Sequence, residues 1–204
     1  MNSNIRNIIF DWGGVLLDLD VEGCIRAFEK AGATHIKEQL NGTNELGVFK
    51  DYECGKIDTP AFRKEICQLI GTELPNAEID RLWNSELLSI PQEKLELLQN
   101  LHSRYNLYLL SNTNELHWEH GSAYAFQHQG KDLKDCFKQI FLSFRMGLAK
   151  PDPAIFRTAL HEAGLSAEET LFIDDAEINC QAAASVGIHA VHYIPGTDLN
   201  KIFE

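Results

Sequence analysis

Short apolar runs recur along the chain, separated by segments in which apolar residues repeat at helical spacing. The runs lie at residues 8–10, 107–110, 171–173 and 188–193, with a weaker one at 140–142. Runs this short between turn signals are typical of buried strands. Because strands alternate with helices, the pattern predicts an α/β fold: a Rossmann-like parallel sheet with helices on both faces.

Three segments predict helices that cover this sheet. Residues 153–163 place their apolar side chains on one face and end at a glycine, as do residues 177–186, which are rich in alanine. Residues 92–101 present three leucines together at helical spacing. The stretch 115–137 is polar and rich in aromatic residues without a clean period, and we expect a helix followed by an irregular loop there.

One interval contains no convincing strand. Between residues 19 and 90 the apolar positions follow helical spacing, and Thr59 with Pro60 reads as a helix N-cap followed by proline at the first helical position. We therefore expect an all-helical cap domain at 19–90. It would be inserted into a core domain made of 1–18 and 91–204.

Composition narrows the functional classes. The formal net charge of −12, without any basic block, argues against nucleic-acid binding and requires local cations at any phosphate site. No apolar run approaches membrane-spanning length, and the early first strand predicts that no signal peptide is present. The cysteines are odd in number and scattered, which predicts reduced thiols in a cytoplasmic protein. They are Cys24, Cys54, Cys67, Cys136 and Cys180.

Asp11 is the most informative residue. It follows the first apolar run directly, and Gly13 and Gly14 lie just behind it. A carboxylate at the end of a buried strand is costly to desolvate unless something binds it. The glycines allow the backbone to bend and a ligand to approach closely. In open parallel sheets, ligands bind at the carboxyl ends of the strands, where this aspartate is expected.

Polar residues follow two further strands in the same way. Ser111 and Asn112 end the second long run, and Asp174 and Asp175 end the third. Lys150 precedes a predicted helix start. If the strands are parallel, these side chains converge at one edge of the sheet.

The converging groups suggest phosphoryl chemistry. Asp11 and Asp175 need a cation in order to lie side by side, and Mg²⁺ with its oxygen ligands suits them. That metal, Lys150 and Ser111 would hold a phosphoryl group while Asp11 attacks it.

These four motifs, in this order, resemble those of the haloacid dehalogenase superfamily of hydrolases. The first runs from Asp11 to Val15, and the others lie at Ser111, Lys150 and the Asp174 pair. Within the superfamily, the chain looks like the group of the bacterial alpha-D-glucose-1-phosphate phosphatase and the N-terminal phosphatase domain of soluble epoxide hydrolase. The segments 111–114, 150–153 and 49–57 carry this closer likeness.

The resemblance implies roles for the phosphate-binding residues. Asp11 would form an aspartyl-phosphate, and Ser111 and Asn112 would bind the transferring phosphoryl group. Lys150 would neutralise charge on the aspartate and on the phosphate. The implied activity is that of a phosphatase of small phosphorylated metabolites, with sugar phosphates as one candidate class.

The resemblance also implies a Mg²⁺ site. Asp11, Asp175 and the backbone carbonyl of Gly13 would be ligands, with Asp174 in support. Asn179 stands where the family often has a polar residue that orients the lysine. His117 and His120 are three residues apart without an evident third ligand, so we favour a surface or cap-facing position for them over a metal site.

Gly13 departs from the superfamily pattern. Most of its phosphatases carry an aspartate two residues after the nucleophile, which protonates the leaving oxygen and then activates water. Such acid–base catalysis raises the reaction rate by roughly 10²–10⁴-fold. The glucose-1-phosphatase-like members also lack this aspartate. The alternatives are therefore a catalytically weak or inactive phosphometabolite-binding protein, or a dehalogenase-type hydrolase, which would need no metal. The oligomeric state stays open.

Overall fold

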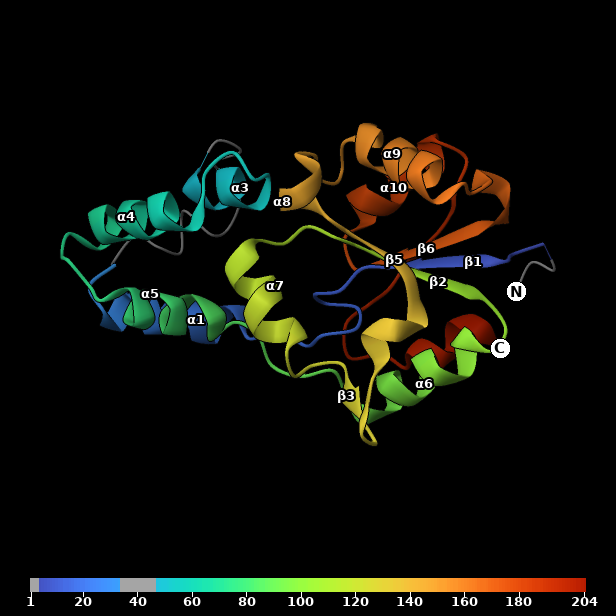
Figure 1. Ribbon diagram of the computed structural model, residues 1–204, viewed down its shortest axis with the longest axis horizontal. Coiled ribbons are helices and arrows are strands. Elements are labelled where there is room, and N and C mark those ends of the chain that lie inside the picture. Colours follow the sequence, from blue (N-terminus) through green and yellow to red (C-terminus); the bar gives the residue numbers. More distant parts are fainter. Residues whose placement is uncertain (1–3, 34–46) are drawn as a thin grey trace.

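A single five-stranded sheet forms the centre of the molecule (Figure 1). The computed structural model describes residues 4–33 and 47–204. The strand order is β5-β2-β1-β6-β7 and every neighbouring pair is parallel, which confirms the predicted α/β fold. The strands are β1 (Asn7–Phe10), β2 (Asn106–Ser111), β5 (Phe137–Leu142), β6 (Thr170–Asp174) and β7 (His189–His192).

Alternate side chains of β1 face the two sides of the sheet, as strand geometry requires. Ile8 and Phe10 belong to the hydrophobic cluster beneath the sheet, whereas Ile9 belongs to the cluster above it. Helices cover both clusters, with α9 and α10 over one face and α6 under the other (Figure 1). These elements are α6 (Gln92–His102), α9 (Pro153–Ala163), α10 (Glu177–Ser185) and the C-terminal 3-10 helix η3 (Leu199–Phe203).

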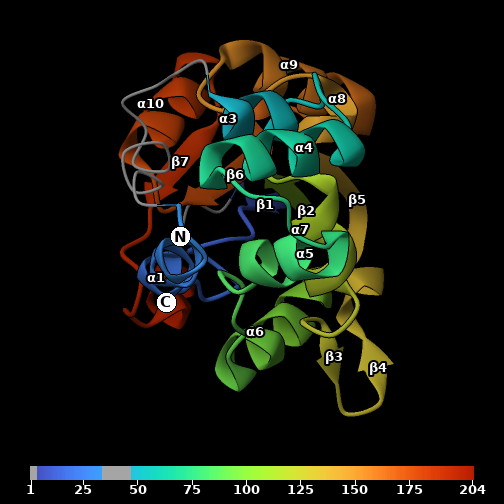
Figure 2. The same cartoon turned by 90° about the vertical axis from the view of Figure 1, so that its left-hand side faces the viewer.

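The interval 19–90, called the helical insertion from here on, packs around a hydrophobic cluster of its own. Its helices are α1 (Val21–Lys30), α3 (Val48–Glu53), α4 (Thr59–Ile70) and α5 (Asn76–Asn84). Phe28, Phe62 and Trp83 are buried at the centre of this cluster. In Figure 2 these helices lie in front of the sheet. Residues 34–46 of the insertion lie outside the described residues.

The predicted cap of α4 is shifted by one residue. Asp58, not Thr59, is the N-cap: its side chain accepts a hydrogen bond of 2.9 Å from the Ala61 backbone N–H. Thr59 is the first residue of the helix, and its hydroxyl lies 2.7 Å from the hydroxyl of Tyr52. The prediction was wrong because Asp and Thr are both good caps and stand side by side in the sequence.

The insertion enters and leaves the rest of the chain at one place. Leu19 and Leu87 form an antiparallel bridge, and the Asp20 N–H donates to the Glu86 carbonyl over 2.8 Å. The two connecting segments are therefore hydrogen-bonded to each other like the strands of a hairpin.

Residues 115–137 are more regular than expected. They form α7 (Glu115–Ser122), a small antiparallel hairpin of β3 (Gln127–His128) and β4 (Lys131–Asp132), and the 3-10 helix η1 (Leu133–Cys136). The expected helix is present. The hairpin escaped prediction because two-residue strands are too short to produce an alternating pattern. Aromatic packing fixes the segment, since Trp118 lies edge-on to Trp12 with ring centroids 5.1 Å apart.

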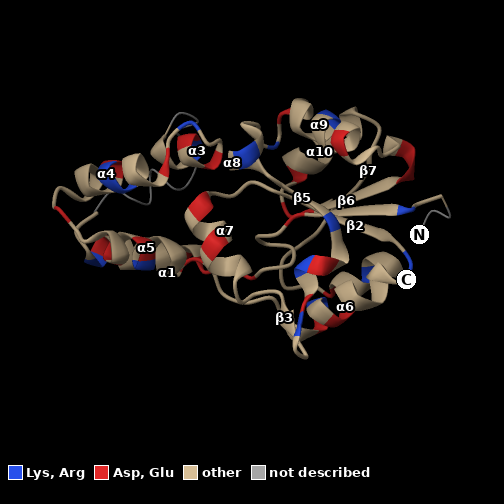
Figure 3. Cartoon of the chain, in the orientation of Figure 1, with Lys and Arg blue, Asp and Glu red and all other residues tan. Residues whose placement is uncertain are grey.

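Charged residues of the described chain do not gather on one part of the molecule. Acidic and basic residues are spread along the helices of both the insertion and the remainder of the chain (Figure 3). The five cysteines are free thiols. Among the described residues, we find no helix with the length and apolar character needed to cross a bilayer.

Candidate active site

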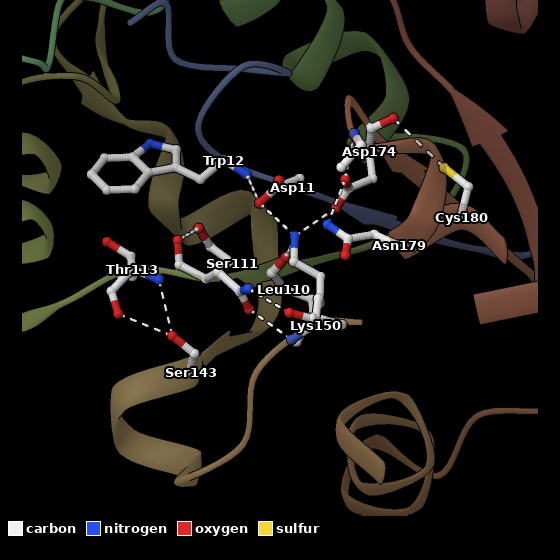
Figure 4. Close-up of polar contacts among 12 residues, drawn as sticks. Asp11, Trp12, Leu110, Ser111, Thr113, Ser143, Lys150, Asp174, Asn179 and Cys180 are labelled. Carbon is white, nitrogen blue, oxygen red and sulfur yellow. Dashed lines mark hydrogen bonds and ion pairs between the residues drawn. The ribbon is translucent and has the colours of Figure 1, made fainter. Parts of the chain in front are cut away.

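Asp11 lies where β1 ends. Its backbone N–H donates to the Ile173 carbonyl over 2.9 Å, which continues the ladder between β1 and β6 one step beyond the strand. One carboxylate oxygen accepts a 2.7 Å hydrogen bond from the Trp12 N–H and lies 2.9 Å from Lys150 Nζ (Figure 4). The side chain is almost completely buried, and these two contacts fix its position.

Lys150 joins the ends of three strands. Its ammonium group contacts Asp11 at 2.9 Å, Asp174 at 2.6 Å and the Leu110 carbonyl at 3.1 Å. A lysine has three donors, so each finds one acceptor. The side chain is only about 1% exposed. A buried charge of this kind is stable only when it is paired and hydrogen-bonded, as here.

Asn112 holds the backbone of this lysine. Its amide nitrogen donates to the Lys150 carbonyl, and its amide oxygen accepts from the Lys150 N–H, both over 2.8 Å. The side chain therefore positions Lys150, and the second N–H of its amide group remains to donate to a phosphate oxygen. The Ser111 hydroxyl makes only a long 3.4 Å hydrogen bond to the Asn112 carbonyl. Both residues stay predicted phosphate ligands.

Asp174 is the anchor of the acidic pair. It is fully buried and accepts 2.9 Å from the Asn179 amide and 2.8 Å from the Ala176 N–H, in addition to its contact with Lys150. Asn179 therefore acts on the lysine through Asp174, with which it shares a hydrogen bond, not through a direct contact.

The buried charges shift one another's protonation. Burial raises the pKa of Asp11 to about 7, although the positive charge of Lys150 opposes the shift. Burial alone would lower the pKa of Lys150, but the carboxylates of Asp11 and Asp174 raise it above the ordinary value. Burial and the neighbouring Asp174 also raise the pKa of Asp175. One lysine is thus insufficient to keep all these carboxylates ionised, and a further cation would favour their charged forms.

The donor set suits a hard divalent cation. Asp11, Asp174 and Asp175 each offer a carboxylate oxygen, and these oxygens lie within 4.8 Å of one another. Mg²⁺ is bound in proteins by such oxygen ligands. The Asp11–Asp174–Asp175 cluster therefore fits a Mg²⁺ ion.

Gly14 explains how Asp175 reaches this cluster. Its φ of +77° favours glycine, and a Cβ atom built on it would lie 2.2 Å from an oxygen of Asp175. Any side chain at this position would collide with the carboxylate. The second glycine after the nucleophile is thus required by the close approach of the metal-binding aspartate.

A small cavity of about 70 Å³ adjoins this cluster, and we call it the site cavity. From the sheet edge, Gly13, Ser111 and Asn112 line it. From the helical insertion, Glu53 and Glu86 line it. The two glutamates were not singled out in the sequence, because they lie 33 positions apart and share no motif with the strand ends.

His117 also lines the site cavity but has a structural partner. Its ring stacks on Trp83 with centroids 4.4 Å apart, and its Nε2 lies 3.1 Å from the Trp83 carbonyl. Burial lowers the pKa of His117 to about 4, so the ring is neutral near pH 7. It is buried against the insertion and is not part of the one metal cluster found among the described residues.

Comparison with known proteins agrees with this geometry. The family model of the haloacid dehalogenase-like hydrolases matches residues 5–187. D-ribitol-5-phosphate phosphatase of Bacteroides thetaiotaomicron is 32% identical over 194 residues, which cover 95% of this chain and 94% of that protein.

Two solved structures are similar over nearly the whole chain. A haloacid dehalogenase family enzyme of Bacteroides thetaiotaomicron, crystallised with magnesium and inorganic phosphate, has a TM-score of 0.93 and 40% identity, covering 98% of this chain and 100% of that one. A predicted hydrolase of this type from Porphyromonas gingivalis has a TM-score of 0.90 and 34% identity, covering 98% and 97%.

Proposed function

Because this chain belongs to the haloacid dehalogenase-like hydrolases, we propose that it removes phosphate from small metabolites through an aspartyl-phosphate on Asp11. It is a phosphomonoester hydrolase, and Mg²⁺ is its cofactor. The observation that carries the proposal is the contact of Lys150 Nζ with Asp11 at 2.9 Å and with Asp174 at 2.6 Å. This contact places a fixed positive charge beside the attacking carboxylate.

The proposed reaction proceeds in two displacements at phosphorus. A carboxylate oxygen of Asp11 attacks the phosphorus, and the bond to the leaving oxygen breaks. Water then attacks the same phosphorus and releases phosphate and free Asp11. Lys150 offsets negative charge on Asp11 and on the phosphoryl oxygens, and Ser111 and Asn112 bind that group. Catalysis of phosphoryl transfer rests mainly on such positioning and charge neutralisation.

Three residues would hold the metal. These are Asp11, Asp175 and the backbone carbonyl of Gly13, with Asp174 supporting them through its position in the same cluster. When bound, Mg²⁺ supplies positive charge that offsets the negative charge of the transferring phosphoryl group.

The substrate class proposed is that of phosphorylated sugars and sugar alcohols. The relative from Bacteroides thetaiotaomicron that is 32% identical to this chain is named as a phosphatase of D-ribitol 5-phosphate. A hydroxyl-rich leaving group also suits the site cavity, because carboxylates such as Glu53 and Glu86 accept hydrogen bonds from hydroxyl groups.

We propose that residues 19–90 act as a cap domain over a core of 1–18 and 91–204. The separate hydrophobic cluster of the insertion and its paired connecting segments support this division. A cap at this position would exclude bulk water from the reacting group.

The test is phosphate release from D-ribitol 5-phosphate, related sugar phosphates and an aryl phosphate. Each is measured with Mg²⁺, with a chelator, and with Asp11→Asn in the presence of Mg²⁺. We expect release to need both the metal and Asp11, with a loss in Asp11→Asn of at least about 10⁴-fold.

Two outcomes would change the assignment. Mg²⁺-dependent binding of a phosphate ester without turnover would make the protein a phosphometabolite-binding protein, as the glycine at position 13 suggests. Metal-independent release of halide from a haloacid would instead make it a dehalogenase.

A further inference from the structure

The reaction proposed above lacks a proton donor at the sheet edge. An alkyl phosphate ester releases an alkoxide, which needs a proton as the bond to phosphorus breaks. Gly13 has no side chain to donate one. Lys150 is occupied by three acceptors at 3.1 Å or less. A proton donor among the other residues that line the site cavity would fill this gap.

Glu53 reaches the site cavity from the last residue of α3. Its backbone is tied to the sheet edge, because the Ser143 hydroxyl lies 2.6 Å from the Glu53 carbonyl and 2.9 Å from both the N–H and the carbonyl of Thr113. Ser143 is fully buried, so this link is shielded from water. Glu53 is thereby held next to the segment that follows Ser111.

A close backbone contact fixes the same turn of the insertion. Gly55 has a φ of +65°, and a Cβ atom built on it would lie 2.1 Å from the Phe144 carbonyl. Only glycine permits this approach between the end of α3 and α8 (Ser143–Met146). The position of Glu53 is therefore set by two independent contacts with the body of the protein.

The carboxyl group of Glu53 has no structural partner among the described residues. Neither Glu53 nor Glu86 forms a side-chain hydrogen bond or an ion pair within the described part of the chain. The charges that face Glu53 are those of Lys50 and Lys150, and the charge that faces Glu86 is that of Glu53. His117, which lines the same cavity, is neutral.

Burial gives these carboxyl groups protons near neutral pH. It raises the pKa of Glu53 to about 7, against the attraction of the two lysines, and raises that of Glu86 to about 7 with help from the charge of Glu53. A general acid and base is most effective when its pKa lies near the working pH. Of the two carboxyl groups, that of Glu53 is the one whose pKa is also lowered by the charge of Lys150.

We propose that Glu53 is the general acid and base that replaces the side chain missing at Gly13. This inference rests on the proposed function. As Asp11 bonds to phosphorus, the bond to the leaving oxygen breaks and that oxygen takes the proton of the Glu53 carboxyl group. The resulting carboxylate then takes a proton from the water that attacks phosphorus. The Asp11–phosphorus bond breaks, and both side chains return to their starting states.

The test compares kcat/KM of Glu53→Gln on two esters with different leaving groups. 4-Nitrophenyl phosphate releases a stable anion that needs little protonation, whereas D-ribitol 5-phosphate releases an alkoxide. We expect kcat/KM for the alkyl ester to fall by about 10²–10³-fold and that for the aryl ester by less than about 5-fold. We also expect a burst of nitrophenol equal to the enzyme concentration, because hydrolysis of the acyl phosphate loses its base.

Two matched variants separate chemistry from structure. Glu65→Gln makes the same change on an exposed face of α4, and both esters should be turned over as by the wild type. Glu86→Gln changes the other glutamate that the insertion contributes to the cavity, and it should change kcat/KM for the two esters by the same factor. If Glu86→Gln shows the selective loss and Glu53→Gln does not, the proposal is wrong in its residue.

The remaining outcomes are also decisive. Equal losses of kcat/KM on both esters, or no loss on either, would overturn the role of Glu53 while leaving the phosphatase proposal intact. Should Glu53→Gln fail to fold, the pH profile of the wild type replaces it: kcat/KM must fall above about pH 7 for the alkyl ester but not for the aryl ester. A wild type inactive on every ester would refute the proposed function itself.

Discussion

The sheet edge beside the site cavity and the cavity wall formed by the insertion differ in how their charges are compensated. At the sheet edge, Lys150 and Asp174 are buried and each polar group has a partner, at distances between 2.6 and 3.1 Å. On the wall formed by the insertion, Glu53 and Glu86 line the same cavity without an ion pair among the described residues. Lys150 and Asp174 are thus paired within the protein, whereas the carboxyl groups of Glu53 and Glu86 are left for a ligand.

This difference separates two tasks. Buried ion pairs with full hydrogen bonding fix geometry, and removing one partner is costly because the other charge stays buried. Unpaired carboxyl groups with raised pKa values are free to exchange protons or to bind hydroxyl groups. The sheet edge therefore suits the transfer of phosphate, and the insertion suits handling of the leaving group.

The largest effect is expected from Lys150→Met at the sheet edge. It removes the charge that holds Asp11 and Asp174 together but keeps a side chain of similar length. We expect a loss of about 3 kcal/mol in the free energy of unfolding without Mg²⁺, and a smaller loss with Mg²⁺. Urea unfolding with and without the metal measures both values.

The control for this change is Lys64→Met on the exposed face of α4. A surface substitution of this kind should alter stability by less than about 0.5 kcal/mol. Indistinguishable unfolding curves for the two variants would mean that Lys150 does not hold the sheet edge together.

A smaller effect is expected from Gly14→Ala, which disturbs the position of Asp175. The left-handed φ of +77° costs about 1–2 kcal/mol for any residue with a Cβ atom. The collision with Asp175 should further weaken Mg²⁺ binding by about 10–100-fold. Calorimetric titration with Mg²⁺ gives the affinity, and urea unfolding gives the stability.

Gly164→Ala isolates the backbone cost. Gly164 has a similar φ of +64°, but no atom lies within 4 Å of a Cβ atom built there. This variant should lose comparable stability and keep its Mg²⁺ affinity. If both variants bind Mg²⁺ like the wild type, the close approach of Gly14 to Asp175 has no bearing on the metal site.

The smallest effect concerns Glu86, on the cavity wall formed by the insertion. The pKa of Glu86 is raised to about 7 in the folded state, mainly by burial and then by Glu53, so the folded state binds more protons than the unfolded state. Stability from this group is therefore full below the unfolded pKa and is lost as pH rises toward 7. Between pH 5 and pH 8, the wild type should lose about 1–2 kcal/mol relative to Glu86→Gln.

Urea unfolding at the two pH values measures this difference, with Glu65→Gln as the exposed control that should follow the wild type. Equal pH dependence in the wild type and in Glu86→Gln would show that folding does not raise the pKa of Glu86.

The sequence predicted the sheet and its polar edge better than it predicted the wall formed by the insertion. Apolar strands followed directly by Asp11, Ser111 or Asp174 are local patterns, and the parallel sheet brings their ends together. The pairing of Glu53 with Glu86 depends on how a helix end meets a connecting segment 33 residues later. That arrangement is tertiary, and no local pattern encodes it.

Side-chain roles within a motif were harder to predict than motif positions. Asn112 stays a predicted phosphate ligand, but the sequence did not predict that its amide also pairs with the backbone of Lys150. Asp58 replaced Thr59 as a cap because two adjacent residues could serve. In both cases the residue types allow more than one partner, and local sequence does not say which partners are used.

The paired segments at the base of the insertion also bear on how the chain folds. β1 and β2 are neighbours in the sheet, although roughly 95 residues separate them along the chain. Once Asp20 is bonded to Glu86, the loop still to be closed falls to roughly 30 residues. Closing this shorter loop costs about 1 kcal/mol less conformational entropy. An insertion that forms first thus lowers the barrier to pairing the two central strands and speeds assembly of the sheet that carries Asp11.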